Sequence, residues 1–89
     1  MRFGRFPGAG MRKSVHTRQY QAFCEQLVAA RKKAGITQQQ LADRIGRPQS
    51  FVAKYENGER RLDVVEFLEI ADLIGVDPHV ILRDISRAS

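Results

Sequence analysis

The sequence predicts an all-α domain built from five helices joined by short loops. Apolar residues recur every three or four positions between residues 20 and 85, which is the period of an amphipathic helix. Capping residues and glycines divide this stretch, and each division indicates a helix boundary. No segment alternates apolar and polar residues as a half-buried strand does. With 89 residues, 43% of them hydrophobic, the chain has material for one modest core.

The first helix is expected from Tyr20 to the residues before Gly35. Its apolar stripe follows the i, i+3, i+4, i+7 pattern and consists of Tyr20, Phe23, Cys24, Leu27 and Val28. Its last turn is basic, with Arg31, Lys32 and Lys33. These charges suit either the negative end of the helix dipole or a nucleic-acid phosphate, and the sequence leaves both interpretations open.

Two shorter helices are expected next, separated by a three-residue turn. Thr37 and Gln40 form a capping-box pattern at the start of the second helix, which ends at Gly46. The third is expected from about Gln49 to Asn57. The residues expected to face inward are Leu41, Ala42, Ile45, Val52 and Tyr55.

The fourth helix is expected between a capping pattern at Asp63 and a stop at Gly75. Its acidic residues recur on one solvated strip, namely Glu66, Glu69 and Asp72. The residues expected to face the core are Val64, Val65, Phe67, Leu68, Ala71 and Ile74. Asp77 as cap and Pro78 as first residue begin the fifth helix. Its apolar side chains exceed what one buried face needs, and they are Val80, Ile81, Leu82 and Ile85.

The second and third helices match a helix-turn-helix that spans about Thr37 to Gly58. The close crossing of two such helices needs a small side chain, which Ala42 supplies. The sharp turn favours a residue that tolerates positive φ, which Gly46 supplies.

Three segments, TQQQLADRIG, SFVAKYENGER and LDVVEFLEIADLIGVDP, resemble the phage lambda Cro and repressor class of the XRE family. The resemblance covers about Leu27 to Pro78 and implies a lambda-repressor-like fold that binds double-stranded DNA with its third helix in the major groove. It also implies an ion pair between Arg31 and Glu56. The sequence departs from the class at Pro48, where a capping Ser or Thr is common. Proline cannot cap the third helix with its side chain, and losing such a cap costs about 1 kcal/mol.

The resemblance implies two sets of DNA contacts. Base edges are expected to meet Gln49, Ser50, Phe51 and Lys54, and phosphates are expected to meet Gln38, Arg47, Asn57, Arg60 and Arg61. Gln49 has the amide that pairs with adenine, and Lys54 reaches either guanine or a phosphate. Phe51 either meets a thymine methyl or packs on the second helix or on a partner. Glu56 is expected to be structural, since phosphates repel a carboxylate.

Residues 1–17 are expected to form a flexible basic arm, with Met11 as an alternative start, and residues 18–89 the helix-turn-helix domain. Fifteen Lys and Arg against ten Asp and Glu give a net charge of +5, which suits a polyanionic partner. The charge is unevenly distributed. Residues 1–35 hold eight basic residues against one acidic, whereas residues 62–89 hold six acidic against two basic.

The sequence contains no catalytic constellation, so we expect neither enzyme activity nor a cofactor. Cys24 has no metal-ligand spacing with His16 or His79, and it is expected to be a small buried residue. No long apolar run is present, so we expect no membrane insertion and a place in the cytoplasm, at the prokaryotic nucleoid.

The leading interpretation is a sequence-specific transcription regulator. It is expected to bind as a homodimer through Val80, Ile81, Leu82 and Ile85, although these residues also suit a role in capping the core. Two other classes remain open. The same fold serves in a protein-interaction module, such as an adaptor or an antitoxin, and a basic arm suits a nonspecific nucleic-acid or RNA binder.

Overall fold

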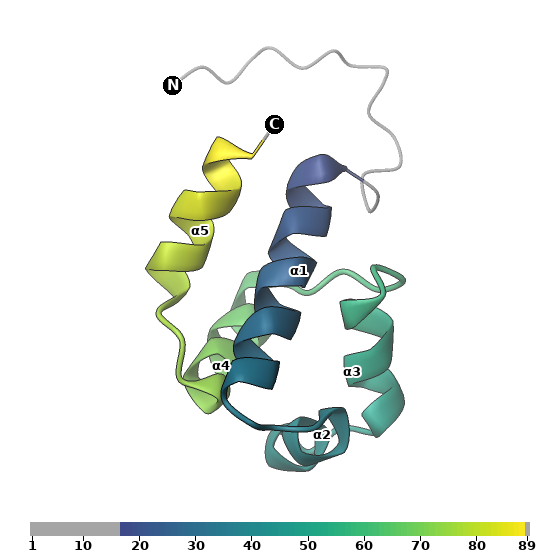
Figure 1. Ribbon diagram of the computed structural model, residues 1–89. Helices are drawn as coiled ribbons and strands as arrows, with labels where there is room; N and C mark the ends of the chain where they lie inside the picture. Colours follow the sequence, from purple (N-terminus) through teal and green to yellow (C-terminus); the bar gives the residue numbers. More distant parts are fainter. Residues whose placement is uncertain (1–16, 89) are drawn as a thin grey trace.

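The computed structural model describes residues 17–88, and within them the chain forms five helices and no strand (Figure 1). The helices are α1 (Arg18–Lys33), α2 (Gln38–Ile45), α3 (Gln49–Glu56), α4 (Val64–Ile74) and α5 (Pro78–Arg87). The predicted all-α fold of five helices is confirmed. The predicted arm up to residue 16, with Met11, lies outside the described residues.

Helix α1 lies at the centre of the arrangement, with α5 on one side and α3 on the other (Figure 1). It contacts α3, α4 and α5, while α2 packs on α3 and α4. The α2–α3 pair therefore has its inner side covered by the other helices, and its outer side faces solvent.

Local capping interactions set the ends of the helices. Thr17 caps α1 by accepting a hydrogen bond from the backbone N–H of Tyr20 at 3.0 Å, so Thr17 is part of the helical domain. Thr37 and Asp63 form the capping boxes that the sequence predicts for α2 and α4. Gly46 ends α2 with φ 74°, the left-handed conformation expected of it.

Pro48 occupies the N-cap position of α3 and makes no side-chain capping hydrogen bond, as the sequence predicts. Its carbonyl oxygen instead accepts from the backbone N–H of Phe51 at 2.9 Å. Proline also fixes its own φ, here −66°, so the turn enters α3 from a restricted backbone conformation.

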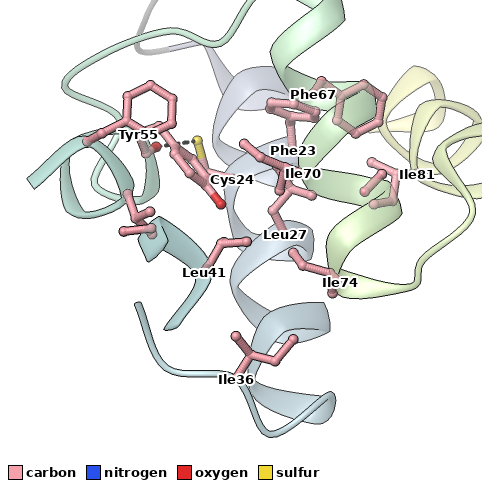
Figure 2. Close-up of a cluster of buried hydrophobic side chains, with 14 of the residues drawn as sticks. Phe23, Cys24, Leu27, Ile36, Leu41, Tyr55, Phe67, Ile70, Ile74 and Ile81 are labelled. Atoms are coloured by element: carbon pink, nitrogen blue, oxygen red, sulfur yellow. Dashed lines mark hydrogen bonds between the residues drawn. The ribbon is translucent and has the colours of Figure 1, made fainter. Parts of the chain in front are cut away.

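The core is one cluster to which all five helices contribute, packed around α1 (Figure 2). The inward faces predicted for α1, α2 and α3 are confirmed, although Val28 and Ile45 are only half-buried. The residues without solvent exposure are Leu27, Leu41, Ala42, Val52, Tyr55, Ile70 and Ala71. Tyr55 has no hydrogen-bond partner for its hydroxyl among residues 17–88, so its contribution to the core comes from its ring.

The core face of α4 differs from the prediction. Val64, Val65 and Leu68 are 71%, 73% and 47% exposed, whereas Ile70, absent from the predicted face, is fully buried. The reason is rotational: the buried stripe runs through residues 67, 70, 71 and 74, and helical periodicity places Val65 on the opposite side. Three of the six residues predicted to face the core are therefore exposed, because burying all six would require a wider stripe than one contact face provides.

Helix α5 buries part of the apolar set predicted to be exposed. Ile81 is only 2% exposed and belongs to the core, while Ile85 is half-buried against it. Val80 and Leu82 remain 37% and 46% exposed. Two of the four residues therefore pack in or against the core, and the other two are exposed.

We predict that Ala42→Leu lowers the free energy of unfolding by about 1–3 kcal/mol, because the added atoms overpack a fully buried position between α2 and α3. Ala29→Leu is the matched control, since Ala29 is exposed on α1. It should stay within about 0.5 kcal/mol of the parent chain. Urea unfolding measures both, and equal effects would contradict close packing at Ala42.

Candidate nucleic-acid interface

Helix α3 turns a polar side toward solvent. Gln49, Ser50 and Lys54 are exposed, while Val52 and Tyr55 on the inner side are fully buried. Because α3 packs on both α1 and α2, this outer side is held in a fixed orientation. Three of the four residues predicted to contact base edges therefore lie on one accessible surface.

Phe51, the fourth residue expected to meet base edges, is the exception, because it is buried. It is 8% exposed, and its ring centroid lies 5.8 Å from that of Tyr55, one turn along α3. The guanidinium carbons of Arg47 and Arg60 lie 4.3 and 4.8 Å from the Phe51 centroid. The ring thus packs against Tyr55 of the same helix and beneath two guanidinium groups.

A buried ion pair joins α1 to the last residue of α3. Arg31 Nε donates to Glu56 Oε2 at 2.7 Å and Nη2 donates to Oε1 at 3.0 Å, with side-chain exposures of 9% and 4%. A third guanidinium donor, Nη1, binds the carbonyl oxygen of Ile36 at 2.8 Å. The hydrogen bonds to Glu56 raise the pKa of Arg31. The ion pair implied by the resemblance is therefore confirmed.

Two glutamines extend this ion pair to the surface. Gln38 Nε2 donates to Glu56 Oε1 at 2.9 Å, and Gln49 Nε2 donates to Gln38 Oε1 at 2.6 Å. We call the chain Arg31, Glu56, Gln38 and Gln49 the polar relay. It leaves Gln49 with one amide N–H and its carbonyl oxygen unused by the relay, which is the donor and acceptor pair that adenine requires.

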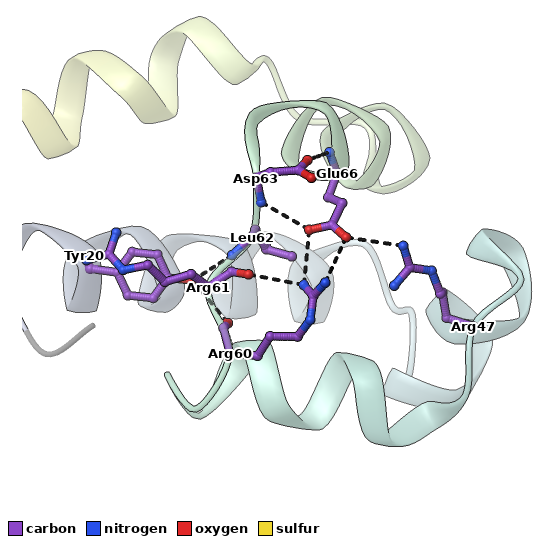
Figure 3. A network of polar contacts seen from close by, with 7 residues as sticks. All are labelled: Tyr20, Arg47, Arg60, Arg61, Leu62, Asp63 and Glu66. Carbon is purple, nitrogen blue, oxygen red and sulfur yellow. Dashed lines mark hydrogen bonds and ion pairs between the residues drawn. The ribbon is translucent and has the colours of Figure 1, made fainter. Parts of the chain in front are cut away.

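A second polar network centres on Glu66, whose side chain is 13% exposed (Figure 3). Its Oε1 accepts from Arg60 Nη1 and from the backbone N–H of Asp63, each at 3.0 Å. Its Oε2 accepts from Arg60 Nη2 at 3.0 Å and from Arg47 Nη2 at 3.1 Å. We call Arg47, Arg60 and Glu66 the arginine clamp. Arg60, followed by the Asp63 N–H, lowers the pKa of Glu66 to about 2.

The arginine clamp was not predicted, because the sequence pattern assigned Glu66 to a solvated acidic strip. Its capping role with Asp63 was visible in the sequence. The two arginines, however, come from a turn and a loop whose positions depend on the tertiary fold. Asp72 and Glu69 are exposed, as predicted for that strip.

The polar relay and the arginine clamp lie on opposite flanks of the exposed side of α3. With 3.6 residues per turn, Gln49 and Phe51 point about 160° apart around the helix axis. Ser50 and Lys54 lie between them on the solvent side. The structure thus places the exposed Gln49 amide on one edge and two cations on the other.

The other predicted phosphate contacts lie in the segment after α3. Asn57 is exposed, and its Nδ2 donates to Glu59 Oε2 at 3.4 Å. The guanidinium carbon of Arg61 lies 4.3 Å from the ring centroid of Tyr20. The Tyr20 hydroxyl donates to the carbonyl of Arg60 at 3.3 Å and accepts from the N–H of Leu62 at 3.2 Å, which fixes this loop against α1.

Residues 17–88 were also compared with the requirements of a metal site, a membrane-spanning helix and a reactive cysteine. No group of three His, Cys, Asp or Glu side chains is placed to hold a metal ion there. No helix in that range is long and apolar enough to span a bilayer. Cys24 is buried, its thiol donates to the carbonyl of Tyr55 at 3.3 Å, and burial raises its pKa. Its contacts are those of a core residue.

Comparison with known proteins identifies the family. The helix-turn-helix family model matches residues 27–81, from α1 into α5. The chain is also similar to a solved structure described as an XRE-family like protein from Pseudomonas syringae pv. tomato str. DC3000. The two share 53% identity and a TM-score of 0.75, over 81% of this chain and 88% of that one. No curated protein matches the sequence. The chain therefore belongs to the XRE family of helix-turn-helix DNA-binding proteins.

Proposed function

We propose that this protein is a sequence-specific transcription regulator, without catalytic activity, that reads the major groove of double-stranded DNA with α3. The observation that carries the proposal is the polar relay, which holds the exposed Gln49 amide from a buried ion pair. A side chain that reads bases must be held in a defined orientation, because a freely rotating amide loses entropy on binding.

In this proposal Gln49 contacts adenine, and Ser50 and Lys54, which lie beside it on the exposed side of α3, contact neighbouring base edges. Phe51 makes no base contact, since its ring is covered by Arg47 and Arg60. Only three of the four original candidates are therefore retained as base readers.

Phosphate contacts are proposed on both flanks of α3. Arg47 and Arg60 approach the backbone from the arginine clamp, and Asn57 and Arg61 approach it from the segment after α3. Gln38 approaches it from the other side, through the amino end of α2 and the amide hydrogen that the polar relay leaves unused. These contacts supply affinity and register without reading sequence, so binding should weaken steeply with salt.

We further propose that the protein binds as a twofold homodimer at half-sites about 34 Å apart. Val80 and Leu82 on α5 are exposed apolar side chains available for such an interface. Leu82 also lines a groove of about 420 Å³ with Tyr20, Val64 and Ile85. Ile81 is not part of this surface, because it is buried in each protomer. A regulator of this kind acts on chromosomal DNA in the cytoplasm.

We predict that Gln49→Ala loses preference at one base pair in each half-site, because the amide that discriminates adenine, worth about 1–3 kcal/mol, is removed. Arg61→Ala should instead weaken all sequences by a similar factor. Selection from a random duplex pool, followed by affinity measurements on single-base variants of the selected site, measures both effects.

Gln21→Ala is the matched control, since Gln21 is an exposed glutamine on α1. It should select the same site as the parent chain. Identical selected sites for the parent and Gln49→Ala would remove the base-reading role from Gln49. Micromolar or weaker affinity for every duplex would instead favour the protein-interaction module.

We predict that Leu82→Glu shifts the protein toward monomer, since association would bury an unpaired carboxylate. Arg87→Gln changes the net charge by the same amount at an exposed position of α5 that points about 140° away from Leu82, and it should leave the association constant unchanged. Sedimentation equilibrium compares the two variants. Unchanged association in Leu82→Glu would show that α5 is not the dimer surface.

A further inference from the structure

We propose that Glu66 is a positioning residue for DNA binding, whose carboxylate holds Arg47 and Arg60 side by side over Phe51 so that both meet the phosphate backbone already ordered. This inference rests on the proposed function, because the arginine clamp forms one flank of the proposed DNA-reading surface. It assigns a binding role to a residue on α4, outside the helix-turn-helix itself.

The geometry of Glu66 supports a holding role. Its two oxygens accept four hydrogen bonds of 3.0–3.1 Å, three from guanidinium groups and one from the backbone of Asp63. Arg60 makes two parallel hydrogen bonds to it, the fork-to-fork arrangement that fixes both distance and plane. The carboxylate is itself anchored by the capping box of α4. Glu66 is thus a rigid acceptor for flexible side chains.

The two arginines come from different segments and meet at one place. Arg47 lies in the turn before α3, and Arg60 lies in the loop after it. Their guanidinium carbons stack on the same Phe51 ring, at 4.3 and 4.8 Å from its centroid. Stacking and hydrogen bonding together restrict long side chains that otherwise sample many rotamers.

Both arginines keep an accessible edge. Their side chains are 42% and 40% exposed, compared with 13% for Glu66. Arg47 uses a single nitrogen, Nη2, for Glu66, which leaves most of its five N–H donors for a phosphate. A phosphate can bind these open edges without displacing the Glu66 carboxylate. The gain from ordering the two arginines should therefore outweigh any competition between Glu66 and the phosphate for them. Glu66 stays ionised at any pH suited to DNA binding, because its pKa is about 2.

Glu66→Gln tests the inference against Glu69→Gln. Both changes remove one negative charge from α4, and Glu69 is exposed. Simple electrostatics predicts that either change strengthens binding to a polyanion. Positioning predicts that Glu66→Gln instead weakens binding, by about tenfold, because two side chains must then be ordered on binding. Affinity is measured for the full chain at several salt concentrations, on the selected duplex and on a mixed-sequence duplex.

The salt dependence and a mutant cycle separate positioning from a loss of structure. Glu66→Gln retains both cations, so its salt slope should equal that of the parent, whereas Arg47→Ala should reduce the slope by about one. In a chain that already carries Arg47→Ala and Arg60→Ala, Glu66→Gln should change affinity less than twofold, because the groups through which it acts are absent. A general structural defect would persist in that background.

Equal or tighter binding by Glu66→Gln than by Glu69→Gln would overturn the inference while leaving the proposed function intact. Absence of duplex binding by the parent chain would overturn both. Arg Nε–Hε relaxation in the DNA-free parent protein gives a readout that needs no variant. Restricted Arg47 and Arg60 signals would support the inference even if Glu66→Gln failed to fold, and averaged signals would overturn it.

Discussion

The buried ion pair between Arg31 and Glu56 is the interaction on which the rest of the DNA-binding surface depends. It joins α1 to the last residue of α3, and Gln38 connects it to α2. Taking one charge away from such a pair typically costs about 3–5 kcal/mol, because the other is left buried without a counter-charge. This one pair of charges therefore links α1, α2 and α3. It also orients Gln49, because Gln49 donates to the Gln38 side chain that binds Glu56.

The order and limits of the helices could be predicted because their signals are local. Thr37, Asp63 and Asp77 cap neighbouring backbone groups, and Gly46 needs a conformation that few other residues adopt. The inner face of α4 was harder to predict. A run as apolar as Val64 to Leu68 offers several possible stripes, and packing against α1, α2 and α5 selects the one that contains Ile70.

The candidate site was predicted in part. The position of Gln49 and the Arg31–Glu56 pair followed from family resemblance, since both depend on a shared helix spacing. The burial of Phe51 did not, because it requires knowing that Arg47 and Arg60 close over its ring. Glu66 was missed for the same reason: its partners lie 6 and 19 residues away in the sequence.

The contact of Tyr20 with the loop after α3 couples distant parts of the chain. One phenol hydroxyl both donates to Arg60 and accepts from Leu62, 40 and 42 residues further along. Tyr20 is in the first turn of α1, which the Thr17 cap stabilises. Fraying of that turn would release the loop that carries Arg60 and Arg61. Any factor that winds or unwinds the start of α1 would therefore act on the position of Arg60 and Arg61 without touching α3.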